Sequence, residues 1–108
     1  MDKAKRKRLE ARGWKIGGVE DFLKLSRDEV RYIDLKLRLA DALRQRRQRR
    51  KLTQKQLAKM IESSQSRVAK MEKGEPTVSV DLLIRSLLVL GTTNRDLAKI
   101  VGPTSAAI

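Results

Sequence analysis

The side chains best suited to noncovalent recognition lie between residues 44 and 70. Gln65, Ser66 and Lys70 occur in one short stretch. Glutamine can bond adenine N6 and N7, serine can donate or accept, and lysine can reach a guanine acceptor or a phosphate. Arg67, between them, suits either a phosphate or a base. The cations that precede this stretch suit phosphates or a solvated helix end, and they are Arg44, Arg46, Arg47, Arg49, Arg50 and Lys51.

Catalytic chemistry has little support in the composition. The chain contains no His and no Cys, which removes imidazole acid–base chemistry, thiolate nucleophiles and the usual metal ligands. Most Asp and Glu residues fall at expected helix starts or on helix surfaces. We therefore expect no enzyme, no metal site and no cofactor. One Trp, one Tyr and one Phe also argue against a stacking platform for single-stranded bases.

The charge is large and unevenly distributed. The 108 residues, enough for one domain, carry a formal charge of +13, which favours a polyanionic partner. Residues 26–51 hold ten Lys and Arg against four Asp and Glu, whereas residues 75–108 hold three against three. We expect a basic working surface before residue 75 and an apolar packing or pairing surface after it.

The chain divides into a tail, an extension, a domain and a second tail. Residues 1–12 predict a flexible basic tail, suited to solubility or to loose phosphate contacts, and residues 13–25 an extension whose Trp14 packs on the domain. Residues 26–101 form the expected domain, followed by a tail at 102–108. No apolar run follows the basic start, and none reaches the roughly 18 residues of a membrane span. We therefore expect a cytoplasmic protein without a membrane partner.

Five helices are predicted from residues that favour helix ends. A Ser or Thr followed three residues later by Glu, Gln or Asp is typical of an N-terminal capping box, and Gly is typical of a C-terminal cap. The expected starts are Ser26, Thr53, Ser63 or Ser64, Ser79 and Thr93, and the expected ends include Arg50, Gly74, Gly91 and Val101. No alternating strand pattern of any length is present, so the predicted fold is all-α.

The first predicted helix has an unusually wide apolar stripe. Val30, Ile33, Leu37 and Ala40 mark one face, and Leu35, Leu39 and Leu43 mark its neighbour. A single surface packed against this helix would cover only part of the stripe. The remainder is expected to be covered by the extension, through Phe22, Leu23 and Leu25, or by another protein chain.

Two short helices across a tight turn form a helix-turn-helix, here at residues 53–74. The run LTQKQLAKMIESSQSRVAKMEKG, residues 52–74, resembles the Xre/Cro-type family of lambdoid phage repressors and bacterial regulators. The resemblance implies a five-helix, lambda-repressor-like DNA-binding domain with a short N-terminal extension. The second motif helix then enters the major groove, with Gln65, Ser66 and Lys70 as base-reading residues.

The resemblance also assigns structural and phosphate-binding roles. Arg47 and Glu72 look like the family's buried ion pair. The expected phosphate contacts are Gln54, Ser64, Arg67, Arg49, Arg50 and Lys51. The chain departs from the pattern at Glu62, because the family usually has Gly in the turn. A positive φ there costs about 1 kcal/mol or more, so either the turn differs or the cost is tolerated.

Three further segments, GWKIGGVEDFLKLS, YIDLKLRLADALRQRR and SVDLLIRSLLVLGTTNRDLAK, resemble the HigA-type antitoxin branch. That branch implies a dimeric autorepressor of a toxin–antitoxin operon that neutralises a RelE/HigB-like ribonuclease toxin. The toxin would contact the extension or the face at Leu35 and Leu39. Two alternatives remain, a stand-alone Xre-type regulator and a nonspecific architectural DNA binder.

A homodimer is expected because one short helix contacts only a few base pairs. Two-fold symmetry doubles the site and places half-sites of a palindromic double-stranded operator about 34 Å apart. The candidate dimer residues on the last helix are Leu97, Ile100 and Val101, with Leu88 and Leu90 before them. These leucines, isoleucines and valines suit either a pairing surface or the core.

Overall fold

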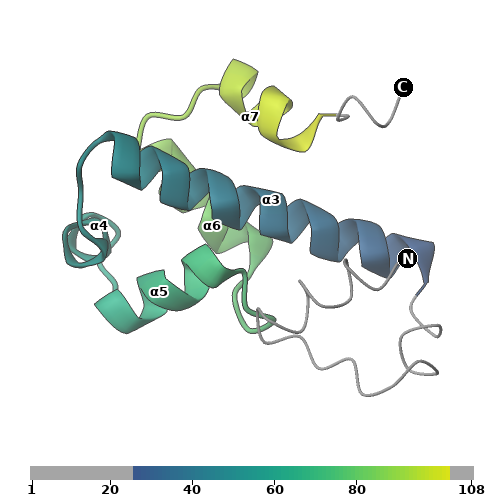
Figure 1. Cartoon of the computed structure of the whole chain (residues 1–108), viewed down its shortest axis with the longest axis horizontal. Helices are drawn as coiled ribbons and strands as arrows, with labels where there is room; N and C mark the ends of the chain where they lie inside the picture. The colour runs from purple at the N-terminus through teal and green to yellow at the C-terminus, as the bar shows by residue number, and fades with distance from the viewer. Residues whose placement is uncertain (1–25, 103–108) are drawn as a thin grey trace.

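The computed structural model describes residues 26–102, which form five α-helices without a strand (Figure 1). The helices are α3 (Arg27–Arg49), α4 (Gln54–Met60), α5 (Gln65–Lys73), α6 (Val80–Val89) and α7 (Asn94–Val101). The all-α, five-helix prediction is confirmed for this part of the chain. The predicted basic tail, the extension with Trp14 and most of the C-terminal tail lie outside the described residues.

Each helix begins after a Ser or Thr with extended backbone. The hydroxyl oxygen of each cap accepts the backbone N–H three residues on at 3.0–3.1 Å. The caps are Ser26, Thr53, Ser64, Ser79 and Thr93, so Ser64 rather than Ser63 starts α5. Complete capping boxes occur at Thr53 with Gln56 and at Thr93 with Asp96. Each cap satisfies a backbone donor that the helix itself leaves unbonded.

Four of the five described helices end in a Schellman motif. In this motif a left-handed residue lets the next N–H reach the carbonyl five residues earlier. These N–H···O bonds, of 2.7–3.2 Å, join Leu52 to Arg47, Ser63 to Ala58, Glu75 to Lys70, and Thr92 to Leu87. The left-handed residues are Lys51, Glu62, Gly74 and Gly91, with φ between 54° and 84°. The chain therefore turns sharply after α3, α4, α5 and α6.

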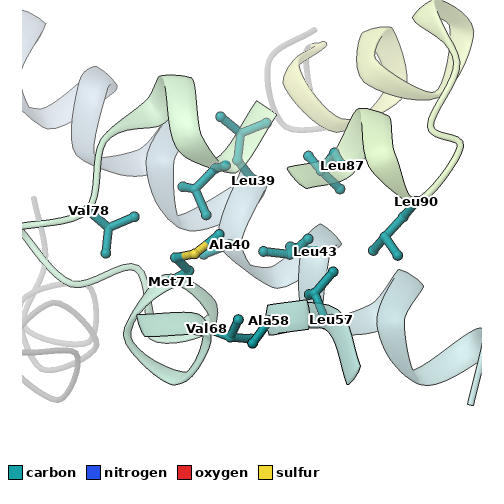
Figure 2. Packing of buried hydrophobic residues seen from close by; sticks show 11 residues of the cluster. Leu39, Ala40, Leu43, Leu57, Ala58, Val68, Met71, Val78, Leu87 and Leu90 are labelled. Carbon is teal, nitrogen blue, oxygen red and sulfur yellow. The ribbon is translucent and has the colours of Figure 1, made fainter. Parts of the chain in front are cut away.

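Helix α3 is the centre of the fold and packs against α5, α6 and α7. Figure 2 shows Leu39 and Leu43 of α3 among side chains from α4, α5 and α6. Leu39 and Leu43 are fully buried. The prediction that Leu39 lies on a face open to another protein is therefore wrong, because Leu39 and Leu43 are buried in the core that α3 shares with α4, α5 and α6. Leu35, Val30 and Leu37 of the same stripe are only partly buried.

The C-terminal end of α5 is fixed closely against α3. The positive φ of Gly74 favours glycine, and a Cβ added there would lie 2.7 Å from Leu37 Cδ2, so the end of the Leu37 side chain would have to move. Lys36, although 2 % exposed, donates from Nζ to the Pro76 carbonyl at 2.9 Å. Burial lowers the pKa of Lys36 from its usual value. Helix α3 thus positions both the end of α5 and the loop that follows it.

Candidate nucleic-acid interface

Helix α5 has a buried inner side and a polar outer side. Val68 and Met71 are fully buried and pack in the core (Figure 2). Gln65, Ser66 and Arg67, in the first turn, are all exposed. Lys70, one turn farther on, is exposed as well. The structure thus brings these four sequence-predicted residues onto accessible positions of one short, firmly packed helix.

The turn between α4 and α5 has a left-handed backbone conformation at Glu62, where the family usually has glycine. Its φ is +54°, so the left-handed conformation is present and its cost is tolerated. The Glu62 N–H donates to the Lys59 carbonyl at 3.2 Å, and the Ser63 N–H donates to the Ala58 carbonyl at 2.7 Å. These two bonds satisfy carbonyls at the end of α4 and help offset the strain. The turn is therefore tight without glycine.

A buried ion pair joins α3 to the end of α5. Arg47 Nε donates to Glu72 Oε2 at 2.5 Å, and Nη2 donates to Oε1 at 3.1 Å. Arg47 Nη1 also donates to the Leu52 carbonyl at 2.6 Å. The side chains of Arg47 and Glu72 are only 12 % and 4 % exposed. Such a bidentate pair restricts the orientation of α5 relative to α3 because each partner would otherwise be a buried, unpaired charge.

Gln54 belongs to the same network, a contact that the sequence did not indicate. Its Nε2 donates to Glu72 Oε1 at 3.2 Å. A side-chain amide nitrogen carries two hydrogens, so one remains for a phosphate oxygen. The structure thus ties the first residue of α4 to the last turn of α5, and the predicted phosphate contact would start from a fixed side chain.

The basic row at the end of α3 divides into two groups. Arg46 and Arg47 are partly buried and paired, Arg46 with Asp96 of α7 at 3.4 Å. The others are exposed: Arg44 lies one turn before the end of α3, and Arg49, Arg50 and Lys51 lie at the turn into α4. In Figure 1 this end of α3 lies at the same end of the molecule as α4 and the start of α5. The three cations at the turn are therefore available to a polyanion that contacts α5.

A cleft of about 520 Å³ lies between α4 and the start of α5. Its lining includes Lys55, Lys59, Ser63 and Gln65. Both lysines are exposed. Their spacing alone does not single them out as functional, because two lysines four residues apart on a helix surface are common. Only the placement of α4 beside Gln65 distinguishes them.

The segment that contains α4 and α5 matches a known protein family. The family model described as helix-turn-helix matches residues 43–97, just over half of the chain. The chain belongs to this helix-turn-helix family. Members of this Xre/lambda-repressor type are DNA-binding transcriptional regulators, so the predicted Xre/Cro-type family is confirmed. No curated protein and no solved structure matches the chain.

The family match ends at residue 97, in α7, the helix that carries the three predicted dimer residues. Leu97 and Ile100 are partly buried and pack against the core. Val101 is 46 % exposed. Leu90, also suggested for a pairing surface, is only 5 % exposed and belongs to the buried core cluster (Figure 2), so that part of the prediction is wrong.

Other exposed apolar side chains lie near the end of α6. Leu88 is 51 % exposed and Val89 is 45 % exposed. Leu88 is one of the predicted pairing residues, whereas Val89 is not. The sequence analysis placed Leu88 and Leu90 together on the pairing surface, but the rotation of α6 against α3 exposes Leu88 and buries Leu90.

Within residues 26–102, no helix combines the length and apolarity needed to cross a bilayer. The same residues contain no group of three or more Asp and Glu side chains arranged to hold a metal ion. The cleft between α4 and α5 is lined by lysines, amides and hydroxyls rather than by converging carboxylates.

Proposed function

We propose that this chain is a sequence-specific regulator that inserts α5 into the major groove of double-stranded DNA. One observation carries the proposal: α5 is held from within by buried Val68, Met71 and Glu72, while Gln65 and Ser66 are exposed at its N-terminal end. A fixed helix that presents hydrogen-bonding side chains suits direct readout of base edges. Lys70 extends the readout by one turn.

Phosphate contacts would set the depth and register of α5 in the groove. Gln54 offers its remaining amide hydrogen, and the Ser64 hydroxyl, which accepts from the Arg67 N–H at 3.1 Å, can still donate its own hydrogen. The cationic contacts of the proposal are Arg49, Arg50, Lys51 and Arg67, all exposed. Because phosphate contacts release counterions, binding should weaken steeply with salt.

A second copy of the chain is the proposed occupant of the exposed apolar positions Leu88, Val89 and Val101. Charge favours this choice: residues 75–108 hold equal numbers of basic and acidic residues, so two copies meeting there avoid the repulsion that a charge of +13 causes elsewhere. Leu97 and Ile100 would support this surface from beneath. A two-fold dimer would read a palindromic operator.

Autorepression and toxin neutralisation are the finer parts of the proposal. They rest on the HigA-type resemblance of residues 13–101, of which 13–25 lie outside the described residues. The expected partner is a small RelE/HigB-like ribonuclease. A stand-alone regulator has the same DNA-binding surface but no such partner. Co-expression with the neighbouring reading frame, followed by co-purification, separates the two, since an antitoxin must retain and inhibit the neighbouring product.

Selection from a pool of duplexes with a randomised 24-base-pair centre tests DNA readout without knowledge of the operator. The proposal predicts enrichment of one palindromic sequence, bound at least 1,000-fold more tightly than a shuffled duplex, about the lower end of specific regulators. Equal binding of all duplexes would instead identify a nonspecific architectural binder.

The dimer is tested separately by sedimentation at a range of protein concentrations. Leu88→Asp and Val101→Asp should shift the protein to monomer without lowering its helical content, because both side chains are exposed in the single chain. Arg85→Asp, beside the exposed Asp81, controls for added negative charge on α6. A wild-type monomer at all concentrations, with or without the selected duplex, contradicts this part of the proposal.

A further inference from the structure

We propose that α7 is exchanged between two copies of the chain, so that the α7 of each copy packs on the α3 of its partner. This inference rests on the dimer part of the proposed function and deepens it, because it names the segment that each copy contributes to the other. The face of α3 that holds α7, here called the α7 cradle, includes Arg38, Ala42, Gln45 and Arg46. In Figure 1 α7 lies along α3 on the far side from α5, so the exchange leaves the DNA-reading helix accessible.

Helix α7 has fewer buried residues than any other described helix. None of its eight residues is buried, whereas α6, with ten residues, buries Leu83, Ser86 and Leu87. An isolated helix of this length is only marginally stable in water, so α7 needs a surface to pack on. A second copy supplies that surface equally well, because its α7 cradle has the same sequence.

Two arginines of the α7 cradle hold the two ends of α7. Arg46 Nη2 lies 3.4 Å from Oδ1 of Asp96, in the first turn of α7. Arg38 Nη1 donates to the carbonyl oxygen of Gly102, the residue that caps the other end, at 3.0 Å. Every copy carries both arginines, so the cradle specifies the position of α7 whichever copy provides the helix.

The connection between α6 and α7 is suited to act as the hinge of this exchange. It comprises only residues 90–93. Gly91, with a φ of +84°, can change its backbone conformation more freely than any other residue type. Thr92 is 5 % exposed, and its Oγ1 has no hydrogen-bond partner among the described residues. A buried hydroxyl without a partner destabilises the closed connection, and a short connection under strain favours exchange between copies.

The apolar positions of the proposed dimer lie directly before this hinge. Leu88 and Val89 are both exposed, and Gly91 follows them in the chain. Two copies that pair through Leu88 and Val89 therefore bring their hinges close together. Exchange requires this proximity, because so short a connection reaches a second α7 cradle only when the two hinges are adjacent. The exchanged dimer keeps the contacts of α7 and adds the surface between the copies.

Charge reversal at the Arg46–Asp96 pair distinguishes contacts within a chain from contacts between chains. A chain with Arg46→Asp, or one with Asp96→Arg, brings like charges together in its own homodimer. In an exchanged heterodimer of these two chains, the α7 of each meets the opposite charge on the other. The two chains, one carrying an isotope label, are mixed in urea and refolded together. Native mass spectrometry then measures the amounts of homodimer and heterodimer.

The proposal predicts about fivefold more heterodimer than homodimer in this mixture, since a pair of exposed like charges costs about as much as an exposed ion pair contributes. The capping contact that Asp96→Arg removes lies within one chain and is therefore lost equally in every pairing.

The matched control mixes chains that carry Asp34→Arg with chains that carry Arg38→Asp. This ion pair has a similar exposure, but both of its members lie on α3, so exchange of α7 cannot bring them together. The bond from Arg38 to Gly102 is lost once for each Arg38→Asp chain, whatever its partner. These chains should pair at random, with equal amounts of heterodimer and homodimer.

A chain with both Arg46→Asp and Asp96→Arg again has opposite charges at the pair, and it keeps the inference testable if a single variant fails to fold. Mixed with the wild type, it should form about fivefold less heterodimer than homodimer, because each exchanged contact would join like charges. Random pairing in this mixture overturns the exchange but leaves the dimer and DNA binding intact. A wild type that stays monomeric, with or without the selected duplex, overturns the exchange together with the dimer, whereas DNA readout is judged separately by the selected and shuffled duplexes.

Discussion

Helices α5 and α6 are built alike but present different chemistry to the outside. Each starts at a serine cap, ends before a left-handed glycine and packs against α3. On α5 the exposed side chains include Gln65, Ser66, Arg67 and Lys70, whereas on α6 they include Leu88, Val89 and an Asp81–Arg85 ion pair. Helix geometry and core packing therefore specify position, and the outward residues decide what each helix can contact.

The two helices also differ in how deeply their ion pairs are buried. Glu72 of α5 is 4 % exposed and bonded to Arg47 and Gln54. The acidic side chain of the α6 pair, Asp81, is 73 % exposed. Buried pairs are strongly destabilised when one partner is removed, while exposed pairs contribute little. The motif helix thus depends on its ion pair, and α6 depends on leucine packing.

The largest effect is expected from Glu72→Leu, which leaves the Arg47 guanidinium buried without its carboxylate. We expect a loss of about 3–5 kcal/mol in the free energy of unfolding, measured by urea denaturation followed by circular dichroism. Asp81→Ala, which breaks the exposed pair, should cost less than about 1 kcal/mol. Similar losses for the two variants would remove the distinction between α5 and α6.

The next largest effect separates the two glycine caps. Gly74→Ala combines a positive φ with a Cβ only 2.7 Å from Leu37 Cδ2, whereas a Cβ at Gly91 meets nothing within 4 Å. We expect a loss of about 2–4 kcal/mol at Gly74 and about 1–2 kcal/mol at Gly91. Thermal unfolding of the two variants side by side measures the difference, and equal losses would mean that the Leu37 side chain rotates to accept the new methyl group.

Features set by neighbouring residues could be predicted from the sequence, and features set by distant ones could not. Thr53 with Gln56, and Gly74 after α5, fix helix ends through bonds within a few positions, so their spacing sufficed. The burial of Leu39 and the bond from Gln54 to Glu72 require α3, α4 and α5 to be placed in space. The cleft beside Lys55 arises from the same placement.

A smaller effect, a gain in stability rather than a loss, is expected when glycine replaces either of the charged left-handed residues, Glu62 and Lys51. Glu62→Gly and Lys51→Gly remove a strain of about 1–2 kcal/mol but add chain entropy to the unfolded state, worth roughly 0.5–1 kcal/mol. Each should therefore raise the free energy of unfolding by up to about 1 kcal/mol. Urea denaturation checks this, and destabilisation would show that the side chain at position 62 or 51 makes a compensating contact.

The smallest effect concerns α7, whose start holds Asp96. The Thr93 backbone N–H and hydroxyl, together with the nearby Arg46 guanidinium, lower the pKa of Asp96 below its ordinary value of 3.8. A carboxyl with a lowered pKa stabilises the fold above the ordinary pKa, and this contribution disappears as the pH falls through the lower, folded-state value. The stability difference between wild type and Asp96→Asn should therefore narrow below about pH 4. A difference independent of pH, in acid titrations followed by circular dichroism, contradicts this assignment.

The most direct test of whether the outward face of α5 chooses the DNA sequence is a competition experiment. The selected and the shuffled duplex compete for binding to the wild type and to Gln65→Ala. A bidentate contact to a base contributes about 1–3 kcal/mol of discrimination. The predicted result is an about 5- to 150-fold loss of preference for the selected duplex, with little change in affinity for the shuffled one. Equal weakening of both duplexes would contradict base readout by α5.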